Sequence, residues 1–157
     1  MAYLLSVAWL SFGLAFSTPA AKSVEKAFLQ NSPRLVGACL LPAGRILIAL
    51  PAPISFSDQL TTEQTVFLFE DIFSAFETLE FFPETAPGTW GPRAGFILKA
   101  RWSFRDRRNR NLYVLQVFFY FQPPVRWASG RPPRPPGGPA PRPVWKISAI
   151  KATPASS

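Results

Sequence analysis

The chain has 157 residues, a formal net charge of +8 and a hydrophobic fraction of 48%, a length and composition typical of one folded domain rather than a disordered chain. It contains no His and a single Cys, which excludes His-based acid–base catalysis, His-containing catalytic triads, most zinc sites and an internal disulfide. The basic excess favours contact with anionic surfaces but says nothing about the fold.

The N-terminal segment contains no charged side chain. Its apolar run is short for a membrane span and suits the hydrophobic region of a secretory signal. Thr18 and Ala20 place small residues at the −3 and −1 positions of a cut after Ala20. We therefore expect residues 1–20 to be a signal peptide and the protein to be exported, either periplasmic or secreted. The alternatives are a buried N-terminal helix and an uncleaved anchor.

Two short helices are predicted next. Residues 22–31 have the apolar spacing of an amphipathic helix. Ser32 followed by Pro33 is typical of an N-cap and first helical residue, so a second helix is predicted over 33–40. Cys39 falls in this helix, and we interpret it as a small core residue.

A strand pair and the clearest helix follow. Residues 45–50 form an apolar run of strand length, and 54–57 are predicted as a short partner strand. Thr61 and Gln64 have the spacing of a capping box, which starts a helix predicted over 62–80. Six apolar residues share one arc of this helix: Val66, Phe69, Ile72, Phe73, Phe76 and Leu79.

Residues 95–122 alternate as two long strands joined by a charged turn. Pairing Phe104 with Tyr113 and Trp102 with Leu115 puts both apolar sets on one face of a sheet. None of the side chains predicted to face inward is acidic. The inward set is Phe96, Leu98, Ala100, Trp102, Phe104, Tyr113, Leu115, Val117, Phe119 and Phe121.

The C-terminal part contains a Pro-rich segment and a last strand. Residues 123–143 cannot form a helix or the interior of a sheet, because Pro lacks a backbone donor and fixes φ. We interpret them as a Pro/Arg-rich insert before a strand over 144–151. Its inward positions are predicted to be Trp145, Ile147 and Ala149, and residues 153–157 to be a disordered tail.

This order of elements resembles the nuclear transport factor 2-like superfamily, the cystatin-like cone. The residues that carry the resemblance are the helix FLFEDIFSAFETLEFF, the hairpin ILKARWSFRDRRNRNLYVLQVFFYF and the closing WKISAIKAT. They are similar to uncharacterised exported bacterial members. The resemblance implies a single α+β domain over 21–152, with a curved antiparallel sheet wrapped around one long helix plus short N-terminal helices. It also implies a ligand pocket at the cone mouth and dimerisation through the outer sheet face.

The resemblance raises the question of enzymatic activity. Members that resemble ketosteroid isomerase need an inward carboxylate base, and the predicted strands place none inside. Glu70 and Asp71 are adjacent on the polar side of the long helix and are interpreted as surface acids. We therefore expect no enzyme, no cofactor and no metal site.

A ligand site inside the cone is one candidate. Trp102, Tyr113 and Phe76 are the side chains that we expect to line it for an apolar or aromatic ligand. The alternative is that these rings fill the core.

The outer sheet face is the second candidate, as an interaction surface. Its apolar row includes Ile97, Phe118 and Tyr120, which is too apolar for a fully solvated face and favours a two-fold homodimer. A basic group adjoins it and suggests contact with anionic surfaces: Lys99, Arg101, Arg105, Arg107, Arg108 and Arg110. Nucleic acid is not expected as a partner, because stacking aromatics and bases must share a face and here point apart.

The sequence thus predicts a non-catalytic exported binding or interaction domain of unknown ligand that uses the outer sheet face and the basic arm. Two alternatives stay open. One is a small enzyme or carrier that holds an apolar ligand in the cone, and the other is a binder of anionic surfaces or polymers.

Overall fold

The computed structural model describes residues 18–84, 95–123 and 144–155. The expected signal segment up to residue 17 and the Pro-rich segment 124–143 lie outside the described residues. Within them the chain forms three helices and six strands: α1 (Pro19–Leu29), α2 (Pro33–Cys39), β1 (Ile46–Leu50), β2 (Phe56–Leu60), α3 (Thr62–Ala75), β3 (Phe76–Glu84), β4 (Phe96–Asp106), β5 (Leu112–Gln122) and β6 (Lys146–Pro154).

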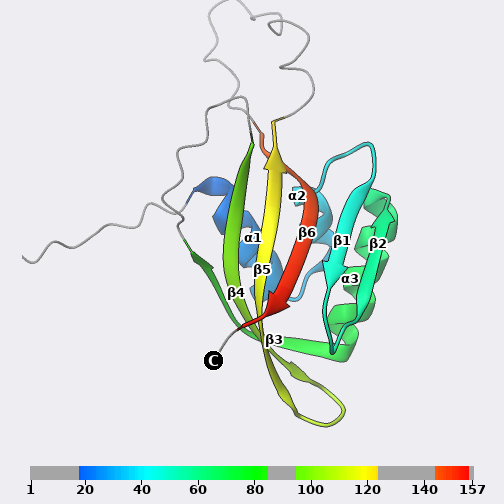
Figure 1. The fold of residues 1–157 in the computed structure, drawn as a ribbon, viewed down its shortest axis with the longest axis vertical. Helices are drawn as coiled ribbons and strands as arrows, with labels where there is room; N and C mark the ends of the chain where they lie inside the picture. Colours follow the sequence, from blue (N-terminus) through cyan, green and yellow to red (C-terminus); the bar gives the residue numbers. More distant parts are fainter. Residues whose placement is uncertain (1–17, 85–94, 124–143, 156–157) are drawn as a thin grey trace, which may run out of the picture.

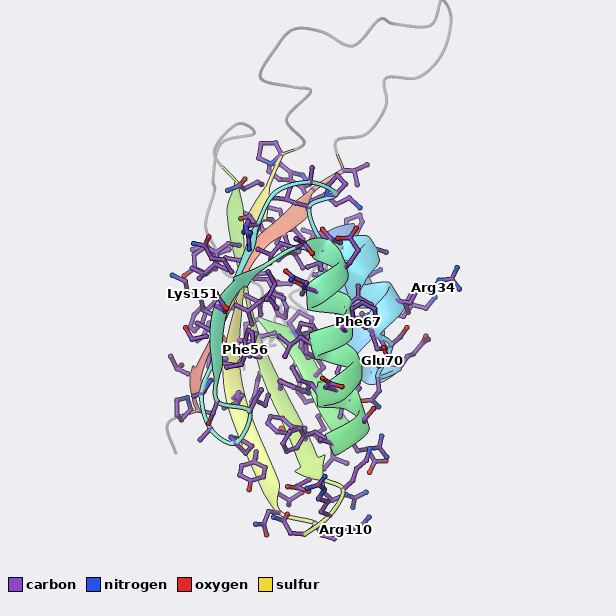
Figure 2. The ribbon with its side chains drawn as sticks, turned by 90° about the vertical axis from the view of Figure 1, so that its right-hand side faces the viewer. Arg34, Phe56, Phe67, Glu70, Arg110 and Lys151 are labelled. Carbon is purple, nitrogen blue, oxygen red and sulfur yellow. The ribbon has the colours of Figure 1, made fainter. Side chains whose placement is uncertain are left out.

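The strands form one six-stranded sheet in the order β2-β1-β6-β5-β4-β3. All neighbouring strands are antiparallel except β1 and β6, which are parallel, so the expected antiparallel sheet contains one parallel pair. The three helices lie on one face of this sheet (Figure 1), and the edge-on view in Figure 2 shows the opposite face without a helix. This arrangement is the predicted α+β cone.

The helix starts follow the local sequence. Thr61 and Gln64 make the predicted capping box at the start of α3, and Ser32 caps α2 as predicted, with Pro33 as the first helical residue. At α1 the cap is Thr18, whose side chain accepts from Ala21 N–H, so this helix begins three residues before the predicted start at residue 22.

The long helix ends earlier than predicted. It stops at Ala75, and Phe76 to Glu84 form the edge strand β3, which pairs with β4 from Phe76–Asp106 onward. The prediction of a helix to residue 80 was wrong because residues 76–84 pair with β4, and such tertiary pairing overrides the weak local preference for a helix. Phe76 is still buried, but Leu79 sits at a register shift and is 40% exposed.

The predicted hairpin is confirmed. Phe104 lies opposite Tyr113 and Trp102 opposite Leu115, as the alternation requires. Most inward side chains of β4 and β5 are buried, and Tyr113 and Phe96 are half-buried at the two ends.

The last strand differs from the prediction in two respects. A register shift between Tyr120 and Phe121 of β5 changes the alternation on β6, so that Ile150 is buried and Ala149 faces outward. The strand also continues to Pro154, which lies opposite Leu115. The expected disordered tail therefore does not begin at residue 153, because the N-terminal half of β5 provides pairing partners there.

The space between the sheet and the helices is filled by aromatic rings centred on Phe28 of α1. Phe28 is 1% exposed and contacts rings from α3 and the sheet, with centroid separations from 4.6 to 5.7 Å. Its partners are Phe69, Phe73, Phe81, Trp102 and Phe119. This set interlocks α1, α3 and the inner sheet face.

Two threonines are the buried polar side chains of the described residues, and both are hydrogen-bonded. Thr65 donates to the carbonyl oxygen of Thr61, at 2.8 Å. The Thr78 hydroxyl accepts the indole N–H of Trp102 at 3.0 Å, and the Thr78 backbone N–H donates to Asn31 Oδ1. These bonds tie the edge strand β3 to the core and to the α1–α2 corner.

Cys39, predicted to be a small core residue, is half-buried and packs against the core. Burial raises the pKa of its thiol, and the nearby Lys146 ammonium opposes this effect. The thiol is therefore neutral at ordinary pH, as expected for a packing role.

Candidate interaction surface

The three residues expected to line a ligand site lie in or beside the filled interior. Trp102 is 1% exposed, and its one polar atom is already bonded to Thr78. Phe76 packs edge-on against Phe104 at 5.3 Å and against Tyr113 at 6.4 Å. The structure thus brings Trp102, Phe76 and Tyr113 together around Phe104, whose ring contacts all three.

The two acids of the long helix lie on the helical layer. Glu70 and Asp71 are exposed, and Figure 2 shows Glu70 directed away from the sheet, on the same side as Phe67. Neither carboxylate is near the inner rings, which agrees with their interpretation as surface acids.

The outer face of the sheet carries two rows of side chains that cross four neighbouring strands. The strand register aligns each row across β1, β6, β5 and β4. The first row is entirely apolar or aromatic and consists of Leu47, Ala149, Tyr120 and Ile97. The second row contains Ala49, Lys151, Phe118 and Lys99. Of the eight, all but Lys151 are half-buried.

A shallow hollow of about 280 Å³ interrupts the first row. It forms where the register shift in β5 turns two small residues of β6, Ser148 and Ala149, towards the outer face. Gly95 lies at its rim with φ +79°, and a Cβ there would be 2.4 Å from the carbonyl oxygen of Phe121. Glycine is therefore required at this close approach.

One cationic side chain, Lys151, lines the hollow. The Lys151 ammonium lies 5.3 Å from the centroid of the Tyr120 ring, within the range of a cation–π contact. Figure 2 places Lys151 on the outer face, opposite the helical layer.

The edge strand β3 adds acids to this face that the sequence reasoning missed. Glu84 is 2.9 Å from Lys99, and Glu77 is 2.6 Å from Arg105. The hydrogen bond from Arg105 lowers the pKa of the Glu77 carboxyl, and hydrogen bonds from Lys99 and Gln116 lower that of Glu84. Glu77 lies within the segment 76–80 that was predicted to be helical, so its pairing with Arg105 was not expected. Glu84 lies beyond that segment, and its pairing with Lys99 follows from the register of β3 with β4.

Part of the basic group predicted at the hairpin turn is hydrogen-bonded within the domain. The Arg107 side chain donates to the carbonyl oxygen of Phe73, and its backbone N–H donates to that of Ala75, at the end of α3. Arg108 and Arg110 are exposed, as is Arg101 on β4. Figure 2 shows Arg110 at the hairpin tip, remote from Lys151.

Two further features of the described residues bear on function. None of the three helices is long and apolar enough to cross a membrane. In the same residues, acidic and Cys side chains do not gather in a group of three or more that could hold a metal ion.

The comparisons with known proteins rest on structure. No protein-family model and no curated protein sequence matches the chain. An NTF2-like protein of unknown function in nutrient uptake from Rhodospirillum rubrum has a TM-score of 0.57 and 9% identity, covering 87% of this chain and 96% of that chain.

Two ketosteroid isomerase-like structures are also similar. The protein from Erwinia carotovora atroseptica has a TM-score of 0.60 and 10% identity, with coverage of 88% of this chain and 92% of that chain. The hypothetical protein from Catenulispora acidiphila, in complex with trimethylamine, has a TM-score of 0.56 and 10% identity, with coverage of 87% and 86%. Identities this low establish the shared architecture alone. The chain therefore has the NTF2-like α+β cone fold.

Proposed function

We propose that the protein is a non-catalytic interaction domain that binds through its outer sheet face, and that its simplest partner is a second copy of the same chain. The observation that carries the proposal is the pair of side-chain rows across β1, β6, β5 and β4. The outer face is more apolar than a solvated sheet face requires. One of its rows consists of Leu47, Ala149, Tyr120 and Ile97.

The interior supports this choice over an enzyme or a carrier. Phe28 occupies the centre of the cone and contacts five other rings. The buried polar side chains of the described residues are Thr65 and Thr78, and neither has an acid–base role at neutral pH. A ligand in the cone would have to displace this packing.

The outer face also suits self-association. In a two-fold dimer the same patch serves both copies, so an apolar centre flanked by both signs of charge is self-complementary. Here the apolar row lies beside the Glu84–Lys99 pair. Binding to an anionic polymer has less support, since Arg105 and Arg107 are engaged within the fold.

Sedimentation velocity at micromolar concentration tests the proposal. We expect the wild-type protein to be a dimer and Phe118→Glu to be a monomer, because the substitution places a charge at the centre of the face. Phe67→Glu is the matched control, since Phe67 is 66% exposed on α3 and lies on the helical side in Figure 2. A monomeric wild type, or a Phe118→Glu variant that remains dimeric, would contradict the proposal.

Export remains part of the proposal and rests on the uncharged apolar segment 1–20. A cut after Ala20 would remove Thr18, the cap of α1, so the mature helix would begin without its capping side chain. The intact mass of the protein recovered from the producing cells tests this, and an uncut chain would count against a cleaved signal.

A further inference from the structure

The hollow on the outer face has a single charged group. Among its described lining residues, Lys151 is the one ion, and the lining contains no acid. Lys151 takes part in neither of the ion pairs formed by the described residues, which join Lys99 to Glu84 and Arg105 to Glu77. The ammonium is therefore available to an anion that enters the hollow.

The rest of the lining is largely apolar, and Ser148 and Gln122 add uncharged polar groups. Leu47, Ile97 and the Tyr120 ring supply apolar surface. The Ser148 hydroxyl donates to the carbonyl oxygen of Tyr120 at 3.2 Å and retains its capacity to accept a hydrogen bond. An occupant would thus meet mostly apolar surface and one cation, which lies beside the Tyr120 ring.

We infer that this hollow binds a small molecule with one carboxylate on an aromatic or branched apolar body. The carboxylate would lie near the Lys151 ammonium, and the body would pack on Tyr120 and Ile97. The volume of about 280 Å³ is close to the lower limit of ligand pockets, roughly 300 Å³, and suits a single ring with a short chain. A cationic ligand would be repelled, and a phosphate would find no second cation in the lining.

The inference goes beyond the proposed dimer, because the hollow belongs to one copy. Ile97 and Tyr120 are nevertheless shared with the proposed interaction surface, so a second copy and a ligand would compete for them. Binding and association must therefore be measured on the same samples.

An NMR titration of the full chain tests the inference with three probes of similar size that differ in charge: sodium phenylacetate, 2-phenylethanol and 2-phenylethylamine. We expect phenylacetate to bind most tightly, in the millimolar range typical of fragments, and to shift the backbone amide signals of Ser148, Ala149 and Lys151. Lys151→Met should weaken phenylacetate binding about fivefold, which is the largest loss expected for an exposed ion pair. The variant should then bind phenylacetate about as weakly as the wild type binds 2-phenylethanol.

Lys26→Met is the matched control, since Lys26 is exposed on α1, on the face of the sheet opposite the hollow. It should leave phenylacetate binding unchanged. Equal affinity for the three probes, an unaltered Lys151→Met variant, or signal changes confined to the core around Phe28 would each overturn the inference. Sedimentation of the same samples, at high concentration and after dilution, separates the two proposals. A protein that is monomeric without ligand and binds phenylacetate refutes the dimer alone. A protein that dimerises, but does not bind phenylacetate after dilution to the monomer, refutes the ligand site alone.

Discussion

Replacing Phe28 with Ala tests whether the cone interior is filled. Phe28 is 1% exposed and packs on five rings, with four edge-to-face contacts at 5.1–5.7 Å and one stacked contact at 4.6 Å. Truncation of a buried Phe costs about 3–5 kcal/mol. Because aromatic pairs of this geometry add about 0.5–1.5 kcal/mol beyond area burial, we expect the upper half of that range, about 4–5 kcal/mol.

The assay is urea-induced unfolding followed by Trp fluorescence, with Phe67→Ala as the control. Phe67 is 66% exposed, so its truncation should change the free energy of unfolding by less than about 0.5 kcal/mol. The cavity left by Phe28→Ala is apolar and should bind benzene, which would raise the urea midpoint of the variant and not that of the wild type. If Phe28→Ala does not fold, Phe28→Leu should show a smaller loss in the same assay. A loss below about 1.5 kcal/mol for Phe28→Ala would refute the filled interior.

Two other predictions concern polar contacts. Thr78→Val leaves the buried Trp102 indole N–H without its acceptor and should lower the free energy of unfolding in urea by about 1–3 kcal/mol. Thr78→Ser keeps the hydroxyl and should retain most of the stability. Equal losses in the two variants would show that the hydroxyl is not the important group. Glu77→Gln tests the pH dependence of stability. Arg105 lowers the pKa of Glu77 in the folded state, so ionised Glu77 stabilises the fold above the unfolded-state pKa of about 4.3. This stabilisation is lost as pH falls through the pKa of Glu77 in the folded state. The difference in urea midpoint between wild type and variant should be largest near neutral pH and vanish in acid, and a difference independent of pH would contradict this reading.

The long hairpin could be predicted from sequence because the alternation of apolar and polar residues on β4 and β5 determines which residues pair. A one-residue slip would expose Trp102 and Phe104 together, and the structure has the predicted pairing. The starts of α2 and α3 were also predictable, because Ser32 and Thr61 act within one turn of their own helices.

What the sequence did not predict depends on residues that are distant along the chain. Residues 76–80 fit a helical arc, and the edge of β4 decides that they form a strand. The register shift beside Tyr120 reverses the orientation expected for Ala149, and no local signal marks it. The parallel pairing of β1 with β6 also joins segments from opposite ends of the domain.

Only part of the candidate interaction surface could be predicted, because some of its residues come together through the strand order. Ile97, Phe118 and Tyr120 were identified as outer-face residues from alternation alone. Leu47 and Ala149 complete their row only through the strand order. Glu77 and Glu84 pair with two of the predicted basic residues, Arg105 and Lys99. The helix prediction concealed the first pair, and the second depends on the register of β3 with β4.

Hydroxyl-radical footprinting at two protein concentrations tests the central claim most directly, namely that the outer sheet face is the interaction surface. Between dilute and concentrated protein we expect Phe118 and Tyr120 to lose reactivity, while Phe67 on α3 keeps the same reactivity. Unchanged reactivity of Phe118 and Tyr120, or protection of Phe67 in their place, would contradict the claim.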